Sequence, residues 1–133
     1  MSDVHTGSCH CRGVSYEVRG DLRPVIYCHC EQCRKTSGNF VGASACDVDA
    51  LVMTSERTLT WYRASPMALR GFCNECGGNL FWKPEHGRYV SLFAGTLDLP
   101  TGIKAEKHIY VADKADYVDL TDGLPQFAQD DDT

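Results

Sequence analysis

The sequence predicts a mainly β protein with a single domain. Short segments either alternate apolar with polar residues or are rich in β-branched and aromatic residues, and turns containing glycine separate them. Seven of the eight cysteines fall into three tight clusters. A length of 133 residues with 43% hydrophobic content suits one domain with its own core.

The expected elements follow in chain order. Residues 14–18 alternate large apolar and polar side chains, as a half-buried strand does. β-branched and aromatic residues predict further strands, and these lie at residues 25–27, 58–62, 67–72 and 88–93. The pattern from Cys30 to Ser37 predicts a helix of one or two turns, which Gly38 ends.

Domain limits and location also follow from composition. We expect one zinc-binding domain over residues 1–128 and a frayed acidic tail over residues 129–133. The first seven residues lack the apolar segment of a signal peptide, which favours the cytoplasm and reduced thiols. No apolar run approaches the roughly 20 residues that span a bilayer, so no membrane partner is expected. The net charge of −5 argues against nucleic acid as a partner, and the oligomeric state stays open.

The cysteine spacing favours zinc over disulfides. Two cysteines separated by one residue would form a strained disulfide with each other, and a chain of this length does not need disulfides to fold. The clusters are two pairs and one triplet, namely Cys9/Cys11, Cys73/Cys76 and Cys28/Cys30/Cys33. A structural zinc takes four protein ligands, whereas a reactive zinc takes three and leaves one position open. The count predicts two zinc ions per chain, although spacing alone does not exclude other pairings.

The two pairs suit a closed site. Extended backbone at Cys9 and Cys11 would turn both sulfurs toward one metal and His10 away from it, and the same argument removes His29 as a ligand. The two residues between Cys73 and Cys76 let the loop curl around an ion, as in a zinc knuckle. A metal held by both pairs would contribute directly to the free energy of folding.

The triplet suits an open site. Arg34 and Lys35 follow it directly and would offset the negative charge of three thiolates. Three sulfur ligands make a bound water a weak acid, so capture of an incoming thiol is the better use of the open position. A distant fourth ligand would close the site instead, and the candidates are Cys46, His86 and His108. An isolated Cys46 is more typical of a small buried apolar residue, and His108 of a packed, hydrogen-bonded side chain.

The residues resemble the glutathione-dependent formaldehyde-activating enzymes and their relatives, which include centromere protein V. The resemblance covers nearly the whole chain and rests on residues 7–16, 28–38, 72–80, 95–98, 108–109 and 124–125. It implies an Mss4-like fold of small β-sheets stapled by zinc. It also implies a structural zinc on Cys9, Cys11, Cys73 and Cys76 and a catalytic zinc on Cys28, Cys30 and Cys33. One departure is Arg12, which stands where relatives usually carry glycine.

The implied activity is that of a zinc-dependent carbon–sulfur lyase. Its open zinc would bind a small thiol such as glutathione, and the thiol would form or lose an adduct with formaldehyde or another carbonyl. The alternative is a non-catalytic zinc module that binds a protein partner. Shared cysteines do not by themselves establish a shared substrate.

Overall fold

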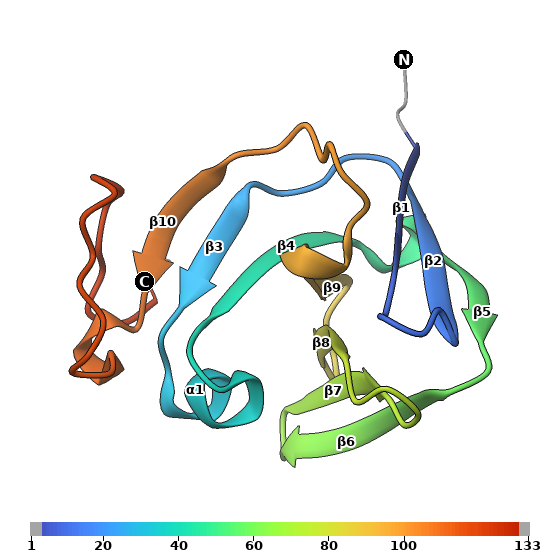
Figure 1. Ribbon diagram of the computed structural model, residues 1–133, viewed down its shortest axis with the longest axis horizontal. Coiled ribbons are helices and arrows are strands. Elements are labelled where there is room, and N and C mark those ends of the chain that lie inside the picture. Colours follow the sequence, from blue (N-terminus) through green and yellow to red (C-terminus); the bar gives the residue numbers. More distant parts are fainter. Residues whose placement is uncertain (1–3, 131–133) are drawn as a thin grey trace. The chain divides into compact units, whose positions relative to one another are not determined.

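The computed structural model describes residues 4–130, which form two compact units. The first unit holds residues 4–23 and 44–102, and the second holds residues 24–43 and 103–130. Strands are the main regular structure of the chain, so the mainly β class predicted from the sequence is confirmed (Figure 1).

The first unit begins with a three-stranded antiparallel sheet. Its strands are β1 (Val4–Ser8), β2 (Val14–Arg19) and β5 (Leu51–Glu56), with β2 in the middle. Val14, Tyr16 and Val18 are buried and alternate with half-exposed residues along β2. This is the predicted half-buried strand, and it turns its apolar side toward the core.

A second set of strands in the same unit runs up and down in antiparallel order. It contains β6 (Leu59–Ser65), β7 (Ala68–Cys73), β8 (Asn79–Pro84) and β9 (Tyr89–Phe93). The last residues of β4 (Val41–Asp47) lie next to β9. Strands β6, β7 and β9 match predicted segments, and β7 delivers Cys73 as expected.

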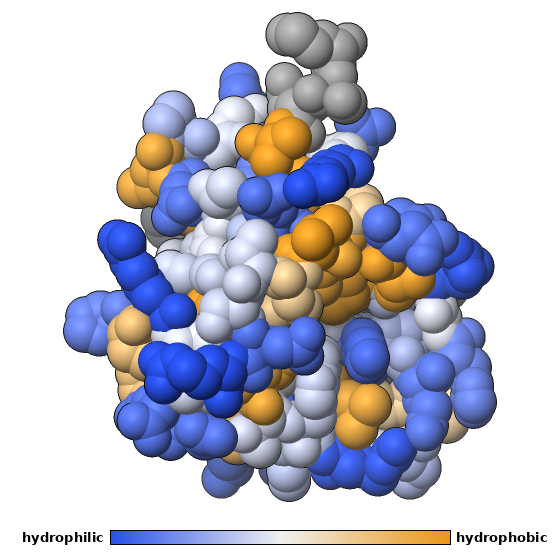
Figure 2. All heavy atoms as spheres, turned by 90° about the vertical axis from the view of Figure 1, so that its right-hand side faces the viewer, coloured by the Kyte–Doolittle hydropathy of each residue, from blue (hydrophilic) through white to orange (hydrophobic). Residues whose placement is uncertain are grey.

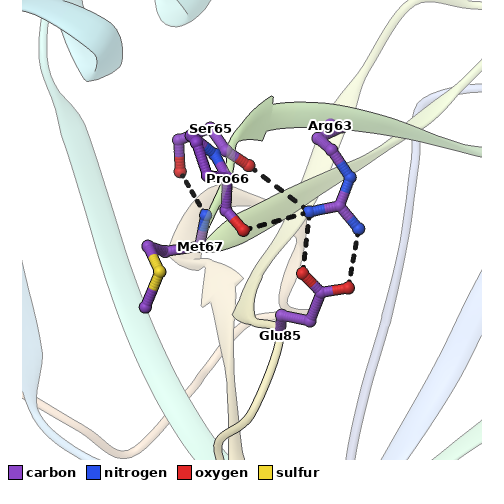
Figure 3. Close-up of polar contacts among 5 residues, drawn as sticks. All are labelled: Arg63, Ser65, Pro66, Met67 and Glu85. Carbon is purple, nitrogen blue, oxygen red and sulfur yellow. Dashed lines mark hydrogen bonds and ion pairs between the residues drawn. The ribbon is translucent and has the colours of Figure 1, made fainter.

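An ion pair clasps the turn between β6 and β7 (Figure 3). Both terminal nitrogens of Arg63 donate to the carboxylate of Glu85, each at 2.8 Å. One of them also donates to the carbonyl oxygens of Ser65 and Pro66, at 3.4 and 3.3 Å. The hydrogen bonds from Arg63 lower the pKa of Glu85. The pair links the β6–β7 turn to the residue after β8.

The core of the first unit is built around Tyr16. Its ring packs edge-on against Phe81, with ring centroids 5.4 Å apart. Its hydroxyl is 2.7 Å from the hydroxyl of Thr96, and burial raises the pKa of Tyr16 to about 12. Leu80 and Leu92 are fully buried in the same unit. The apolar faces of the strands thus meet in one core.

In the second unit, one helix follows one strand and precedes another along the chain. It contains β3 (Val25–Cys28), helix α1 (Glu31–Ser37), the first residues of β4 and β10 (Ala105–Ile109). β3 pairs with β4 antiparallel and with β10 parallel. The helix begins after the N-cap Cys30 and ends at Gly38, whose φ of 90° is left-handed, so the predicted helix is confirmed.

The surface is mostly hydrophilic on the face drawn in Figure 2, where hydrophobic atoms appear in separate groups. Among residues 4–130, no helix is long and apolar enough to cross a membrane. In the region predicted as a frayed tail, the carbonyl oxygen of Gln129 accepts a hydrogen bond from the backbone of Tyr110, at 3.3 Å. Residues 131–133 of that tail lie outside the described residues.

Gly7 tests the packing around Tyr16. Gly7 lies opposite Tyr16 across β1 and β2, and a Cβ there would meet the Tyr16 ring and lie 2.6 Å from the carbonyl oxygen of Thr96. Gly7→Ala should therefore lower the free energy of unfolding by about 2 kcal/mol or more. A Cβ at Gly95 meets no atom within 4 Å, so Gly95→Ala should change stability by less than about 1 kcal/mol. Urea unfolding of both variants measures this, and equal effects would contradict the packing described.

Candidate metal centres

Four cysteine sulfurs of the first unit meet in one cluster. The sulfurs of Cys9, Cys11, Cys73 and Cys76 all lie within 4.8 Å of one another. The Sγ of Cys11 is 3.8 Å from that of Cys9 and 3.5 Å from that of Cys73, and all four thiols are free. Sulfurs around a tetrahedral zinc are about 3.8 Å apart when each Zn–S bond is about 2.3 Å. The spacing therefore fits a four-thiolate zinc site and is far too long for disulfides.

The first pair reaches this cluster by a turn. The expectation of extended backbone at Cys9 and Cys11 is wrong, because Arg12 donates its backbone N–H to the carbonyl of Cys9 at 3.2 Å and closes a tight turn. Arg12 has a φ of 65°, in the left-handed region that favours glycine. The turn thus holds Arg12 in a backbone shape that glycine adopts more readily. His10 is exposed and is not part of the cluster, as expected.

Hydrogen bonds lower the pKa of the Cys73 thiol. Burial acts to raise its pKa, but backbone N–H groups of Cys76 and Glu75 and the hydroxyl of Thr58 lower it to about 5. The two N–H groups lie 3.3 Å from the Cys73 sulfur and the hydroxyl lies 3.1 Å from it. These donors favour a thiolate, the form that binds metal.

The pKa of Cys11, whose sulfur lies next to that of Cys73, shows why this cluster needs a cation. The backbone of Gly13 acts to lower the pKa of Cys11, but the adjacent sulfurs, that of Cys73 first, raise it to about 11. One thiolate in the cluster therefore makes the next one costly. A divalent cation at the centre would remove that cost, because coordination favours the deprotonated form of every sulfur.

The other three cysteines form a separate cluster in the second unit. The sulfurs of Cys28, Cys30 and Cys33 lie within 4.8 Å of one another. β3 ends at Cys28, Cys30 is the N-cap of α1, and Cys33 lies in its first turn. The Cys30 sulfur accepts a hydrogen bond from the backbone N–H of Cys33 at 3.3 Å. Contacts with Cys30 and Cys33 raise the pKa of Cys28, so this cluster also favours a cation.

Among the described residues, this cluster has three members. Within residues 4–130, no further cysteine, histidine or carboxylate brings a ligand atom within 4.8 Å of all three sulfurs. Of the three candidates for closing the site, Cys46 is buried with a pKa raised by burial to about 11, and His86 is exposed. His108 is buried and engaged in hydrogen bonds on both ring nitrogens.

A chain of hydrogen bonds that begins at two buried histidines supports the Cys28–Cys30 segment. His29 Nε2 is 2.9 Å from His108 Nδ1, and His108 Nε2 is 2.8 Å from a carboxylate oxygen of Asp122. Burial, and next the neighbouring His108, lower the pKa of His29, so a neutral imidazole is favoured. The ring of His29 also packs 4.5 Å from that of Phe40. His29 is therefore an anchor between two cysteines and not a ligand. The sequence predicted that His29 is not a ligand, but it did not predict the anchoring role.

Two neighbours of this cluster gave no sequence signal. Asp122 lies 14 residues from its partner His108, in a segment without regular structure. Tyr110 follows Ile109, which pairs with Cys28, and it has a left-handed φ of 56°. Burial first, then the charges of Asp130, Cys28 and others, raise the pKa of Tyr110. The parallel pairing of β10 with β3 places Tyr110 next to the residue that pairs with Cys28, and Asp122 is linked to His29 through His108.

Arg12 provides a direct test of the turn at the four-sulfur cluster. Its left-handed backbone costs a residue with a Cβ roughly 1 kcal/mol relative to glycine. Arg12→Gly should therefore be more stable than Arg12→Ala by about that amount, since both variants lose the same long side chain. Urea unfolding of the zinc-loaded variants measures the difference. An alanine variant as stable as the glycine variant would contradict the strain at this position.

Comparison with known proteins agrees with these features. The model of the family described as glutathione-dependent formaldehyde-activating enzyme matches residues 4–113. A protein of Schizosaccharomyces pombe named as an uncharacterized lyase is 25% identical over 131 residues, which cover 95% of this chain and 92% of the relative. The crystal structure of a Rhodobacter sphaeroides protein, 20% identical, shares the fold with a TM-score of 0.59 over 92% of this chain and 98% of that chain. The family match spans most of the sequence, and the chain belongs to the glutathione-dependent formaldehyde-activating enzyme family.

Proposed function

We propose that this protein is a zinc-dependent enzyme of the carbon–sulfur lyase type, which forms or cleaves the adduct of a small thiol with formaldehyde or another carbonyl. The main observation in support is the difference between its two cysteine clusters, since one has four sulfurs and the other has three. The family match and the relative named as a lyase support an enzyme of this kind. Glutathione is the first thiol to test, because the family is named for it.

The two clusters would hold two zinc ions with different roles. Cys9, Cys11, Cys73 and Cys76 supply a complete tetrahedral set, so their zinc would be structural. Cys28, Cys30 and Cys33 supply three ligands and are the proposed catalytic residues. When bound there, zinc would supply a fourth position that lowers the pKa of an incoming thiol and holds its sulfur.

The chain's own residues would prepare this position. Helix α1 begins at the cluster, and the backbone N–H of Cys33 in its first turn donates to the Cys30 sulfur, which favours negative charge on that sulfur. The basic residues Arg34 and Lys35 lie in the last turn of the same helix and partly offset the charge of three thiolates. The buried hydrogen bond between His29 and His108 holds the Cys28–Cys30 segment in place. The loop is thus fixed before substrate arrives.

The reaction balances without an oxidant or reductant. In the forward direction the thiol loses its proton, and its sulfur forms a bond with the carbonyl carbon. The electron pair of the C=O π bond moves to the oxygen, which takes up a proton to give an S-hydroxymethyl product. In reverse, the C–S bond breaks and the electron pair returns to sulfur. The residues need only position the two reactants and exchange one proton.

The proposed setting is a cytoplasmic enzyme with small-molecule substrates. Reduced thiols suit both clusters, since none of the eight cysteines forms a disulfide. Nucleic acid is not proposed as a partner, because the net charge is −5. A membrane is not proposed either, because no apolar run approaches the roughly 20 residues that span a bilayer.

Two cysteine substitutions separate folding from chemistry. Cys76→Ser should cause loss of the structural metal and destabilise the fold by several kcal/mol, because metal binding contributes directly to folding. Cys30→Ser should leave the fold intact and lower thiol-dependent turnover at least about 100-fold. Circular dichroism with heating, zinc analysis and a formaldehyde assay measure the three effects.

The matched control is Cys46→Ser, since Cys46 is a buried free cysteine outside both clusters. This variant should keep both zinc ions and its activity. Collapse of Cys30→Ser to the same extent as Cys76→Ser would make the three-sulfur cluster structural. That outcome would favour a zinc module that binds a protein partner.

Cobalt substitution tests the open position itself. Each sulfur that binds cobalt adds to the thiolate-to-metal charge-transfer absorption, so glutathione should increase this absorption in the wild-type protein. S-methylglutathione has no ionisable thiol and should not increase it, and Cys33→Ser should abolish the response. A parallel assay follows S-hydroxymethyl adduct formation above the uncatalysed rate. Absence of any response across a panel of small thiols would refute the proposal.

A further inference from the structure

A pocket in the second unit adjoins the helix that carries the three-sulfur cluster. Its volume is about 540 Å³, within the roughly 300–1,000 Å³ of small-molecule sites. One wall is the last turn of α1 with Arg34, Lys35 and Gly38, and the other is residues 113–117. All of these residues belong to one compact unit.

Arg34 lines this pocket as a cation. Within residues 4–130, its Nε is the buried side-chain nitrogen or oxygen without a hydrogen-bond partner, so the guanidinium is not fully paired within the protein. A guanidinium stays protonated, and a carboxylate, whose two oxygens match the planar fork of arginine, pairs with it best. The position of Arg34 in the pocket wall therefore points to an anionic ligand group.

Both walls of the pocket are connected to the three-sulfur cluster by short stretches of backbone. On one side, Arg34 follows Cys33 directly, and its backbone N–H donates to the carbonyl of Cys30 at 2.9 Å. On the other side, the backbone runs from Ile109, which pairs with Cys28, through η3 (Val111–Asp113) into the pocket wall. The helix rises about 1.5 Å per residue, so Cys33 and Gly38 are separated by about 7.5 Å along its axis. A peptide of two or three residues covers that length.

The charges around the pocket suit a ligand with both signs. Arg34 and Lys35 are cationic on the helix side, whereas Asp113 and Asp116 are anionic on the other side. Lys114 already donates to the carbonyl oxygens of Val118 and Ala115, at 2.6 and 3.3 Å. This leaves the helix side as the place for a carboxylate and the side of Asp113 and Asp116 as the place for an ammonium group. An amino acid or small peptide carries both groups.

We propose that this pocket binds the charged end of the thiol substrate, with Arg34 as the residue that anchors its carboxylate. The enzyme then selects small amino-acid or peptide thiols over neutral thiols of similar reactivity. This inference rests on the proposed function, because it places the substrate sulfur at the three-sulfur cluster. It adds a specificity-determining residue that is not a metal ligand.

The test uses a probe that cannot bind metal through a thiolate. S-methylglutathione has the carboxylates and the ammonium group of glutathione but no free thiol. We expect the zinc-loaded wild-type protein to bind it in calorimetry, and Arg34→Gln to weaken binding about ten-fold or more. Arg34→Lys keeps the charge but loses the planar fork, so it should weaken binding to an intermediate degree. The matched control is Arg57→Gln, an exposed arginine in the first unit that should bind as the wild type does.

A second arm shows that the metal site of the variant is intact. In cobalt-loaded protein, 2-mercaptoethanol should change the spectrum equally in the wild type and in Arg34→Gln, because it has no carboxylate. Glutathione should require an about ten-fold higher concentration in Arg34→Gln. This arm also distinguishes the two proposals. A cobalt spectrum that no thiol changes refutes the proposed function, whereas the S-methylglutathione result bears on the pocket alone.

Three results would overturn the inference. The first is S-methylglutathione binding within two-fold in Arg34→Gln and the wild type. The second is absence of binding to the wild type at about 10 mM, a concentration that reveals even weak sites. The third is displacement by inorganic phosphate at equal affinity, which would make the pocket a general anion site.

Discussion

The constraint on which this structure depends is the crowding of cysteine sulfurs that are not joined by disulfides. Seven sulfurs lie in two clusters with spacings up to 4.8 Å, where neighbouring sulfurs raise the pKa of Cys11 and Cys28. Backbone N–H groups and the Thr58 hydroxyl stabilise only part of that charge, mainly on Cys73. A divalent cation in each cluster satisfies the constraint, and in the first unit it would tie together turns that are 62 residues apart, at Cys11 and Cys73.

The two clusters differ in how the chain surrounds them. The four-sulfur cluster lies on two turns, one held in a left-handed shape at Arg12 and the other leading to Gly77 with a φ of 77°. The three-sulfur cluster lies where β3 leads into α1, and the buried rings of His29 and His108 support that segment. In our proposal the first arrangement would hold a zinc ion with four protein ligands. The second would supply three ligands and leave the fourth position to the substrate, which the charges of the adjoining pocket would help to select.

The sequence predicted what depends on local chemistry. Alternation along β2 and the capping of α1 by Cys30 and Gly38 are set by neighbouring residues, so both predictions are confirmed. The turn at Cys9 and Cys11 was missed because Arg12 adopts a conformation that arginine rarely takes. The parallel pairing of β10 with β3, the contact of Asp122 with His108 and the pocket beside Arg34 depend on contacts distant in sequence. No local residue pattern predicts these contacts. The likeness to Mss4 stays a prediction.

The most direct measurement is a crystal structure of the zinc-loaded protein, recorded at the zinc absorption edge with and without bound glutathione. The account predicts two anomalous peaks, one among the sulfurs of Cys9, Cys11, Cys73 and Cys76 and one among those of Cys28, Cys30 and Cys33. The second peak should have a fourth ligand that is not protein, and the sulfur of glutathione should replace it in the complex. A side chain of the protein in that fourth position, or a second peak whose ligands do not change with the thiol, would contradict the account.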